Sequence, residues 1–149
     1  MKDQNKNRLA TITGRYASRQ RDKAALDRRA FDAAFVEVRD KVIRPVFEDI
    51  AAELRTSGHK AVVVDDVAKE SPSIELALGI GGAAPTTDGD RVSFVVIARR
   101  AAPEVLAYLV VRPPALDLVR FAAPSEITAE QVEQILVDAV EHIFACHSV

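Results

Sequence analysis

Aromatic residues are scarce in this chain: tryptophan is absent, and tyrosine and phenylalanine together supply only 5% of the residues. Aromatic rings are the platforms on which proteins stack nucleic-acid bases, so recognition by stacking is disfavoured. The interior must therefore be built mainly from Val, Ile, Leu and Ala, which agrees with the hydrophobic content of 48%.

Cysteine and long apolar runs are also lacking. Cys146 is the single cysteine, which excludes an intramolecular disulfide and suits a reducing compartment. No run approaches the roughly 20 apolar residues of a membrane span, and residues 1–7 are too polar for an export signal. We therefore expect a soluble, cytoplasmic protein that does not contact a membrane.

Positive charge is concentrated near the N-terminus. Nine of the 20 Lys and Arg residues, but only three of the 22 Asp and Glu residues, lie within residues 1–30, so this segment carries +6 and the rest of the chain −8. The total of 149 residues is that of one ordinary domain. We expect a basic, flexible arm over residues 1–20 and a single domain over residues 21–149.

A basic arm suits either nucleic acid or an acidic protein surface. Its candidate nucleic-acid contacts are Arg15, Arg19, Arg21 and Lys23. Because Tyr16 is the only aromatic residue of the arm, we favour a solvated tail, or one that lies on a second copy of the chain.

Apolar residues recur at helical spacing between residues 22 and 56. The stripe consists of Phe31, Phe35, Val38, Val42, Val46, Ile50 and Leu54. Pro45 lacks a backbone N–H and disfavours α geometry at Arg44, which predicts either a kink in a long N-terminal helix or two abutting helices. Gly58 predicts the left-handed end of this helix.

The period of the apolar residues then changes to that of strands. Five segments show it: 61–64, 74–80, 91–99, 105–111 and 116–121. The short connection at residues 100–103 predicts an antiparallel hairpin, and Pro113 and Pro114 set off the last segment as an edge strand. The predicted fold class is α+β, a two-layer sandwich with about five mainly antiparallel strands.

A C-terminal helix is predicted by its own start signals. Thr128 and Gln131 have the spacing of a capping box, and Ile127 and Val132 have that of a hydrophobic staple. The apolar stripe that follows, from Val132 to Phe144, should pack this helix on the sheet.

Motifs that carry chemistry are weak. Gly79, Gly81 and Gly82 follow a strand but lead to another strand, which predicts a hairpin loop and not a dinucleotide site. His142 and Cys146 share a helix face, but two ligands do not close a zinc site. We expect no metal, no cofactor and no catalytic residue.

Charged residues at strand ends are the remaining candidates for ligand binding. Arg91, Arg99 and Arg112 fall at the ends of two neighbouring strands, and Asp65 and Asp66 close another. Such side chains either anchor a small ligand or solvate the strand ends, and the second role is the more common.

Three classes of function are consistent with this sequence. The first is a non-enzymatic interaction module that forms a homodimer and binds a protein or peptide, because apolar positions on both faces of segments 92–97 and 105–111 need a cover. The second is a small-molecule binder or enzyme with a pocket between helices and sheet. The third is nucleic-acid binding through the arm. We favour the first.

Overall fold

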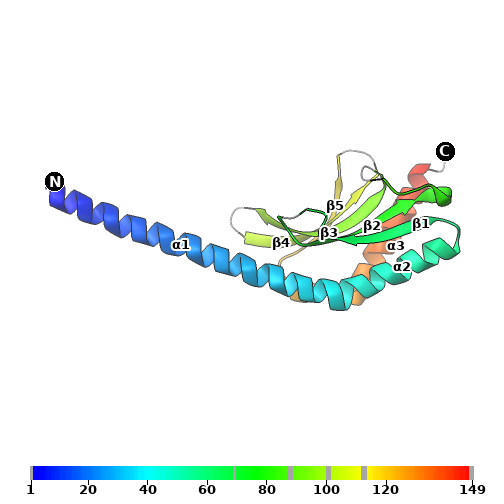
Figure 1. The fold of residues 1–149 in the computed structure, drawn as a ribbon, viewed down its shortest axis with the longest axis horizontal. Helices are drawn as coiled ribbons and strands as arrows, with labels where there is room; N and C mark the ends of the chain where they lie inside the picture. The colour runs from blue at the N-terminus through cyan, green and yellow to red at the C-terminus, as the bar shows by residue number, and fades with distance from the viewer. Residues whose placement is uncertain (1, 69, 87–88, 100–101, 112–113, 148–149) are drawn as a thin grey trace.

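The computed structural model describes residues 2–68, 70–86, 89–99, 102–111 and 114–147. A long helix precedes five strands, and a second helical segment follows them (Figure 1). The predicted α+β class is thereby confirmed. No helix within the described ranges has the length and apolar character needed to cross a membrane.

The N-terminal helix changes its hydrogen-bond spacing just before Pro45. Helix α1 (Asp3–Val38) passes through a π-helical segment (Arg39–Ile43) into α2 (Arg44–Thr56). Within that segment the amide of Arg44 bonds five residues back to the carbonyl of Arg39. Pro45 has no N–H to donate, so the α ladder lacks one bond at this point. The predicted interruption is confirmed.

The helix begins much earlier than the apolar pattern indicates. Periodicity predicts it from about residue 22, whereas α1 starts at Asp3. The segment 1–20, predicted to be an arm, is therefore helical from Asp3 onward, and its flexibility stays a prediction. At the other end α2 stops at Gly58, which has a φ of +90°, as predicted.

The sheet is a simple antiparallel meander. Its strands are β1 (Lys60–Asp65), β2 (Ser73–Gly79), β3 (Arg91–Arg99), β4 (Ala102–Val110) and β5 (Leu116–Phe121), and they lie side by side in chain order. The predicted loop at residues 100–103 is too long, because Pro103 belongs to β4 and pairs with Ala98. Proline is tolerated there because β5 pairs with β4 only from Val105 onward.

Helix α3 (Ala129–His147) begins at the predicted capping box. The amide of Thr128 donates to Gln131 Oε1 at 3.0 Å, and the amide of Gln131 donates to Thr128 Oγ1 at 3.3 Å. Two amides at the helix start are thus satisfied by side chains, which confirms the boundary.

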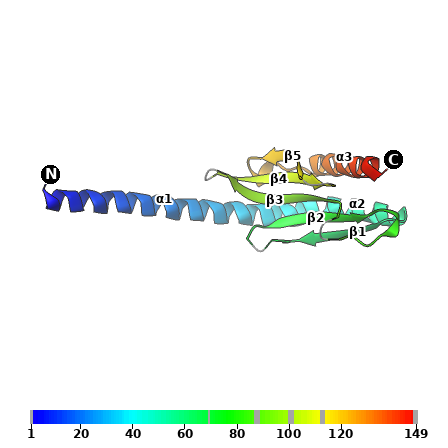
Figure 2. The same ribbon diagram turned by 90° about the horizontal axis from the view of Figure 1, so that it is seen from above.

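Helices α2 and α3 cover one face of the sheet, giving two layers (Figures 1 and 2). The largest fully buried side chains of this core are Phe35, Ile43, Phe47, Ile74, Leu76, Val92, Phe94, Val96, Val105, Val132, Leu136 and Ile143. Phe47 of α2 meets Phe94 of β3 edge to face, with ring centroids 5.7 Å apart. Val105 and Leu109 belong to this same core. The helical layer therefore covers these two apolar positions of β4.

Candidate interaction surfaces

Most of α1 projects away from the body of the protein (Figures 1 and 2). Every residue from Lys2 to Asp27 is exposed. Along the described part of the helix, Arg28 is the first side chain with a hydrogen bond to another segment, donated from Nη2 to Ser71 Oγ at 3.1 Å. Residues 3–27, which we call the α1 arm, form about 25 residues of helix and extend roughly 38 Å.

The α1 arm has few internal interactions that would stabilise it alone. Thr11 and Thr13 bond to carbonyls of their own preceding turn, and Arg21 donates to Ser18 at 3.3 Å. Gly14 lowers helix propensity by about 1 kcal/mol relative to alanine. Because surface helices gain most of their stability from packing an apolar face, this arm is suited to a partner surface.

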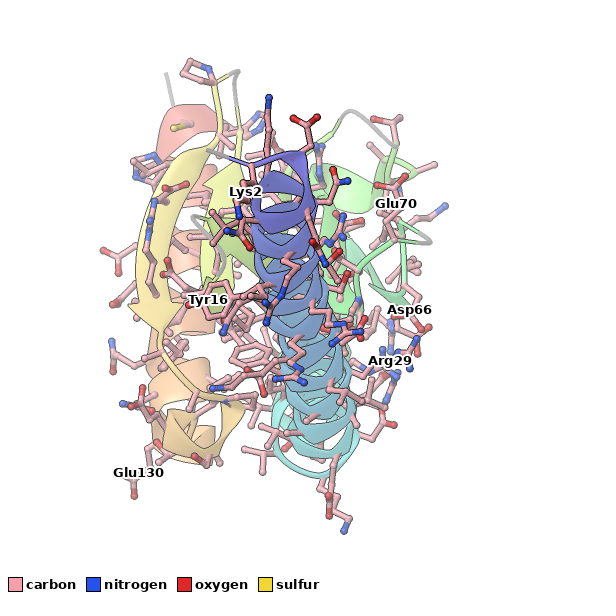
Figure 3. The ribbon with its side chains drawn as sticks, turned by 90° about the vertical axis from the view of Figure 1, so that its left-hand side faces the viewer. Lys2, Tyr16, Arg29, Asp66, Glu70 and Glu130 are labelled. Carbon is pink, nitrogen blue, oxygen red and sulfur yellow. The ribbon has the colours of Figure 1, made fainter. Side chains whose placement is uncertain are left out.

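The α1 arm carries a stripe of exposed apolar side chains. The apolar stripe consists of Leu9, Ile12, Tyr16 and Leu26, each more than half exposed. All four occupy a and d positions of one heptad frame, and Arg19 and Lys23 hold the two positions between Tyr16 and Leu26. In the view down α1, Tyr16 lies on the flank toward β5 and α3, whereas Arg29 lies toward Asp66 (Figure 3).

Positive side chains adjoin the apolar stripe. Arg8 and Arg15, seven residues apart, lie along one flank of the stripe, whereas Arg19 and Lys23 lie within it, at the positions between Tyr16 and Leu26. Arg21 lies on another flank. The structure therefore gathers three of the four predicted nucleic-acid contacts, and nucleic-acid binding stays a prediction.

Asp65 and Asp66 are held by Arg44 of α2 and Arg39 of the π-helical segment, respectively. Arg44 Nη2 lies 2.6 Å from Asp65 Oδ2, and Arg39 Nη1 lies 2.8 Å from Asp66 Oδ1. Asp40 Oδ1 lies 3.0 Å from both guanidinium groups. The hydrogen bond from Arg44 lowers the pKa of Asp65, and those from Arg39 and Arg44 lower the pKa of Asp40.

These five residues form what we call the arginine clamp. It ties the π-helical segment to the end of β1 and to the turn that follows it. Arg39 Nη1 also lies 3.5 Å from the carbonyl oxygen of Ser73, the first residue of β2. The clamp therefore sets where α1 leaves the body. This geometry favours a structural role for Asp65 and Asp66, and their role in ligand binding stays a prediction.

Of the three arginines predicted at strand ends, only Arg91 can be placed. Its Nε lies 3.2 Å from Glu75 Oε1 on the sheet face that lacks helices, and Ser93 Oγ donates to the same oxygen at 3.0 Å. The side chain of Arg99 and all of Arg112 lie outside the described residues. The carboxylate of Glu75 therefore balances the positive charge of Arg91 on the predicted cationic surface.

A groove separates β5 from α3. It contains two adjacent cavities of about 430 and 250 Å³, which share Leu109, Leu116 and His142 as lining residues. Leu116 is 51% exposed and Val119 is 37% exposed, although they pair with the core residues Leu109 and Ala107 and so point toward the helical layer. We call this the β5/α3 groove.

The wall formed by α3 adds polar groups to the β5/α3 groove. Asp138, His142 and Cys146 follow one another every four residues along it. The structure thus brings the pair His142 and Cys146 to an apolar cleft. Within the described ranges, no three His, Cys, Asp or Glu residues are grouped so that they could hold a metal ion.

The sequence contains an indirect signal for this groove. Packed helices lie 8–10 Å apart and strands about 4.8 Å apart, so two helices span roughly four strands. Five predicted strands with two covering helices leave about one strand bare, and β5 is that strand.

Comparison of the chain with protein-family models, curated proteins and solved structures finds no significant match, so the functional assignment depends on these surfaces alone.

Proposed function

We propose that this protein is a non-enzymatic interaction module that forms a homodimer and uses the α1 arm as its principal contact. The observation that carries the proposal is the exposure of every residue from Lys2 to Asp27 in one continuous helix. A protein or peptide partner is bound by the assembled module, through apolar surface that one copy leaves open.

The apolar stripe supplies enough energy for this association. Burying a large aliphatic or aromatic side chain contributes about 1.5–3 kcal/mol, and the four members of the stripe are each more than half exposed. In a two-fold dimer each contact occurs twice, so the gain doubles. A micromolar dimer requires about 8 kcal/mol beyond an association cost of roughly 4–15 kcal/mol, and the doubled gain is of the same order as this total.

The decisive experiment compares two pairs of charge insertions in the α1 arm. Leu9→Glu with Ile12→Glu places two carboxylates on the apolar stripe, whereas Ala10→Glu with Ala17→Glu places the same charge on the opposite face of the helix. We expect the full chain to have twice the 16.2 kDa monomer mass in light scattering. The stripe variant should be monomeric and the control dimeric. A monomeric parent chain at micromolar concentration contradicts the proposal.

A small-molecule binder is the second candidate, and the β5/α3 groove is the observation that favours it. Its two cavities together are within the usual volume range of ligand sites, and apolar walls with a few polar groups are typical of such sites. Native mass spectrometry separates the candidates: a monomer that retains a stoichiometric small molecule supports the binder, whereas a ligand-free dimer supports the module.

A further inference from the structure

We propose that the β5/α3 groove is the docking site for the α1 arm of a second copy of this chain, which lies there as a third helix of the helical layer. This inference depends on the proposed self-association and names the surfaces that make it. Leu116 and Val119 face the helical layer but remain exposed, so a helix is missing at this position. The apolar stripe of the arm supplies the face that such a helix needs.

Charge favours α3 as the neighbour of the arm. Helix α3 contains Glu130, Glu133, Asp138 and Glu141 but no lysine or arginine. Arg8 and Arg15 form a positive flank beside the apolar stripe of the arm, and Arg19 and Lys23 lie within the stripe between Tyr16 and Leu26. When the stripe enters the groove, basic and acidic flanks of neighbouring helices are brought together, which steers and orients the contact.

The same charges disfavour the simplest alternative, in which two α1 arms pair with each other. Antiparallel pairing centred on Tyr16 would set Leu9 against Lys23, since both lie seven residues from Tyr16. It would also bring Ile12, four residues from the centre, close to Arg19, three residues from it. Leu9 and Ile12 would then meet cations, Tyr16 would meet its own copy, and the basic side chains of the two arms would repel one another. The arm therefore has a better partner in α3 than in itself.

Length and direction agree with this docking. Helix α3 has 19 residues and extends about 28 Å, which the roughly 38 Å arm can span. The N-terminus of α1 and the C-terminus of α3 lie at opposite ends of the molecule (Figures 1 and 2). A two-fold rotation perpendicular to α1 therefore carries the N-terminal end of one arm toward the C-terminal end of α3 in its partner. Leu9 should then lie near Cys146, with the two helices antiparallel.

Cys146 provides a native reporter, because it lines the groove and is the only cysteine of the chain. We would introduce a second cysteine as Leu9→Cys, Ile12→Cys or Tyr16→Cys, with Asn7→Cys on the opposite flank as the matched control. Each variant is treated with a short bismaleimide after its dimer mass is verified. We expect covalent dimers that are strongest for Leu9→Cys, weak for Asn7→Cys, and lost when Cys146 is replaced by serine.

Two results would overturn the docking while leaving the dimer in place. One is a verified dimer in which none of the three stripe cysteines cross-links above the Asn7→Cys control. The other is cross-linking that persists without Cys146, which would show that the arms pair with each other. A monomer mass for the parent chain refutes self-association itself, so the two failures are distinguishable.

A charge exchange gives an independent test. Arg15→Glu with Arg19→Glu, or Asp138→Lys with Glu141→Lys, should each weaken the dimer at least about tenfold, since every contact occurs twice. Combining both pairs in one chain should restore most of the affinity. Glu133→Lys, on the flank of α3 away from the groove, serves as the control and should have little effect. Additive losses in the combined variant would contradict the docking.

Discussion

The bond between Arg39 and Asp66 tests whether the arginine clamp fixes the point where α1 leaves the body. The Arg39 side chain is 7% exposed and that of Asp66 is 54% exposed, with 2.8 Å between Nη1 and Oδ1. A hydrogen bond to a charged group contributes about 1.5–3 kcal/mol, and exposure of one partner reduces this toward the lower limit. We therefore expect Asp66→Asn to lower the free energy of unfolding by about 1–2 kcal/mol.

Asparagine is the appropriate replacement because residue 66 has a φ of +50°, a conformation that Asn tolerates nearly as well as Asp. Arg39→Met removes the guanidinium but retains an apolar stem, and it also removes the cost of burying a charge. Its loss should also be about 1–2 kcal/mol. The double variant should lose less stability than the two single variants lose together, and the difference, the coupling energy, should be about 1 kcal/mol.

The assay is denaturant unfolding at one fixed protein concentration. The dependence of the unfolding free energy on denaturant concentration is compared between variants, because an unchanged slope shows that only stability has changed. The exposed pair Lys41 and Glu37, whose nitrogen and oxygen lie 2.7 Å apart, serves as the control cycle and should show no measurable coupling. Additive losses for Arg39→Met and Asp66→Asn would refute the reasoning. The clamp would then be a surface contact that does not determine the course of α1.

Three further predictions concern single residues. Thr128→Ala should cost about 1 kcal/mol in denaturant melts because an amide of α3 loses its acceptor, and unchanged stability would argue against the cap. Gly14→Ala has free space for a methyl group and should stabilise the helical arm by about 1 kcal/mol, visible as higher helicity in circular dichroism; lower helicity would contradict it. The pKa values of Asp65 and Asp40 are lowered from 3.8 on folding, so their contribution to stability is fully present well above pH 3.8 and is lost as the pH falls through the folded values. Asp65→Asn should therefore lower stability at pH 7 and flatten its decline in acid, whereas an unaltered pH profile would exclude this contribution.

The sequence by itself determines the elements whose residues interact locally. The capping box at Thr128, the stop at Gly58 and the interruption before Pro45 all depend on neighbours within a few residues, so they are readable without the fold. Apolar and polar residues alternate along the strands because one face of the sheet is buried. The first half of α1 is not predicted from the sequence, because a periodic pattern of apolar residues marks only a helix that buries one face. Residues 2–27 are not buried in one copy of the chain.

Only the tertiary structure decides which surfaces remain open. The positions of Val105 and Leu109 depend on strand register, which a shift of one residue would reverse. The partners of Asp65 and Asp66 come from a helix more than 20 residues away in sequence, and the groove exists because two helices are too narrow for five strands. The strand register and the ion pairs depend on lateral packing between distant segments, which local sequence pattern does not record. For the groove, the sequence offers only the count of helices and strands.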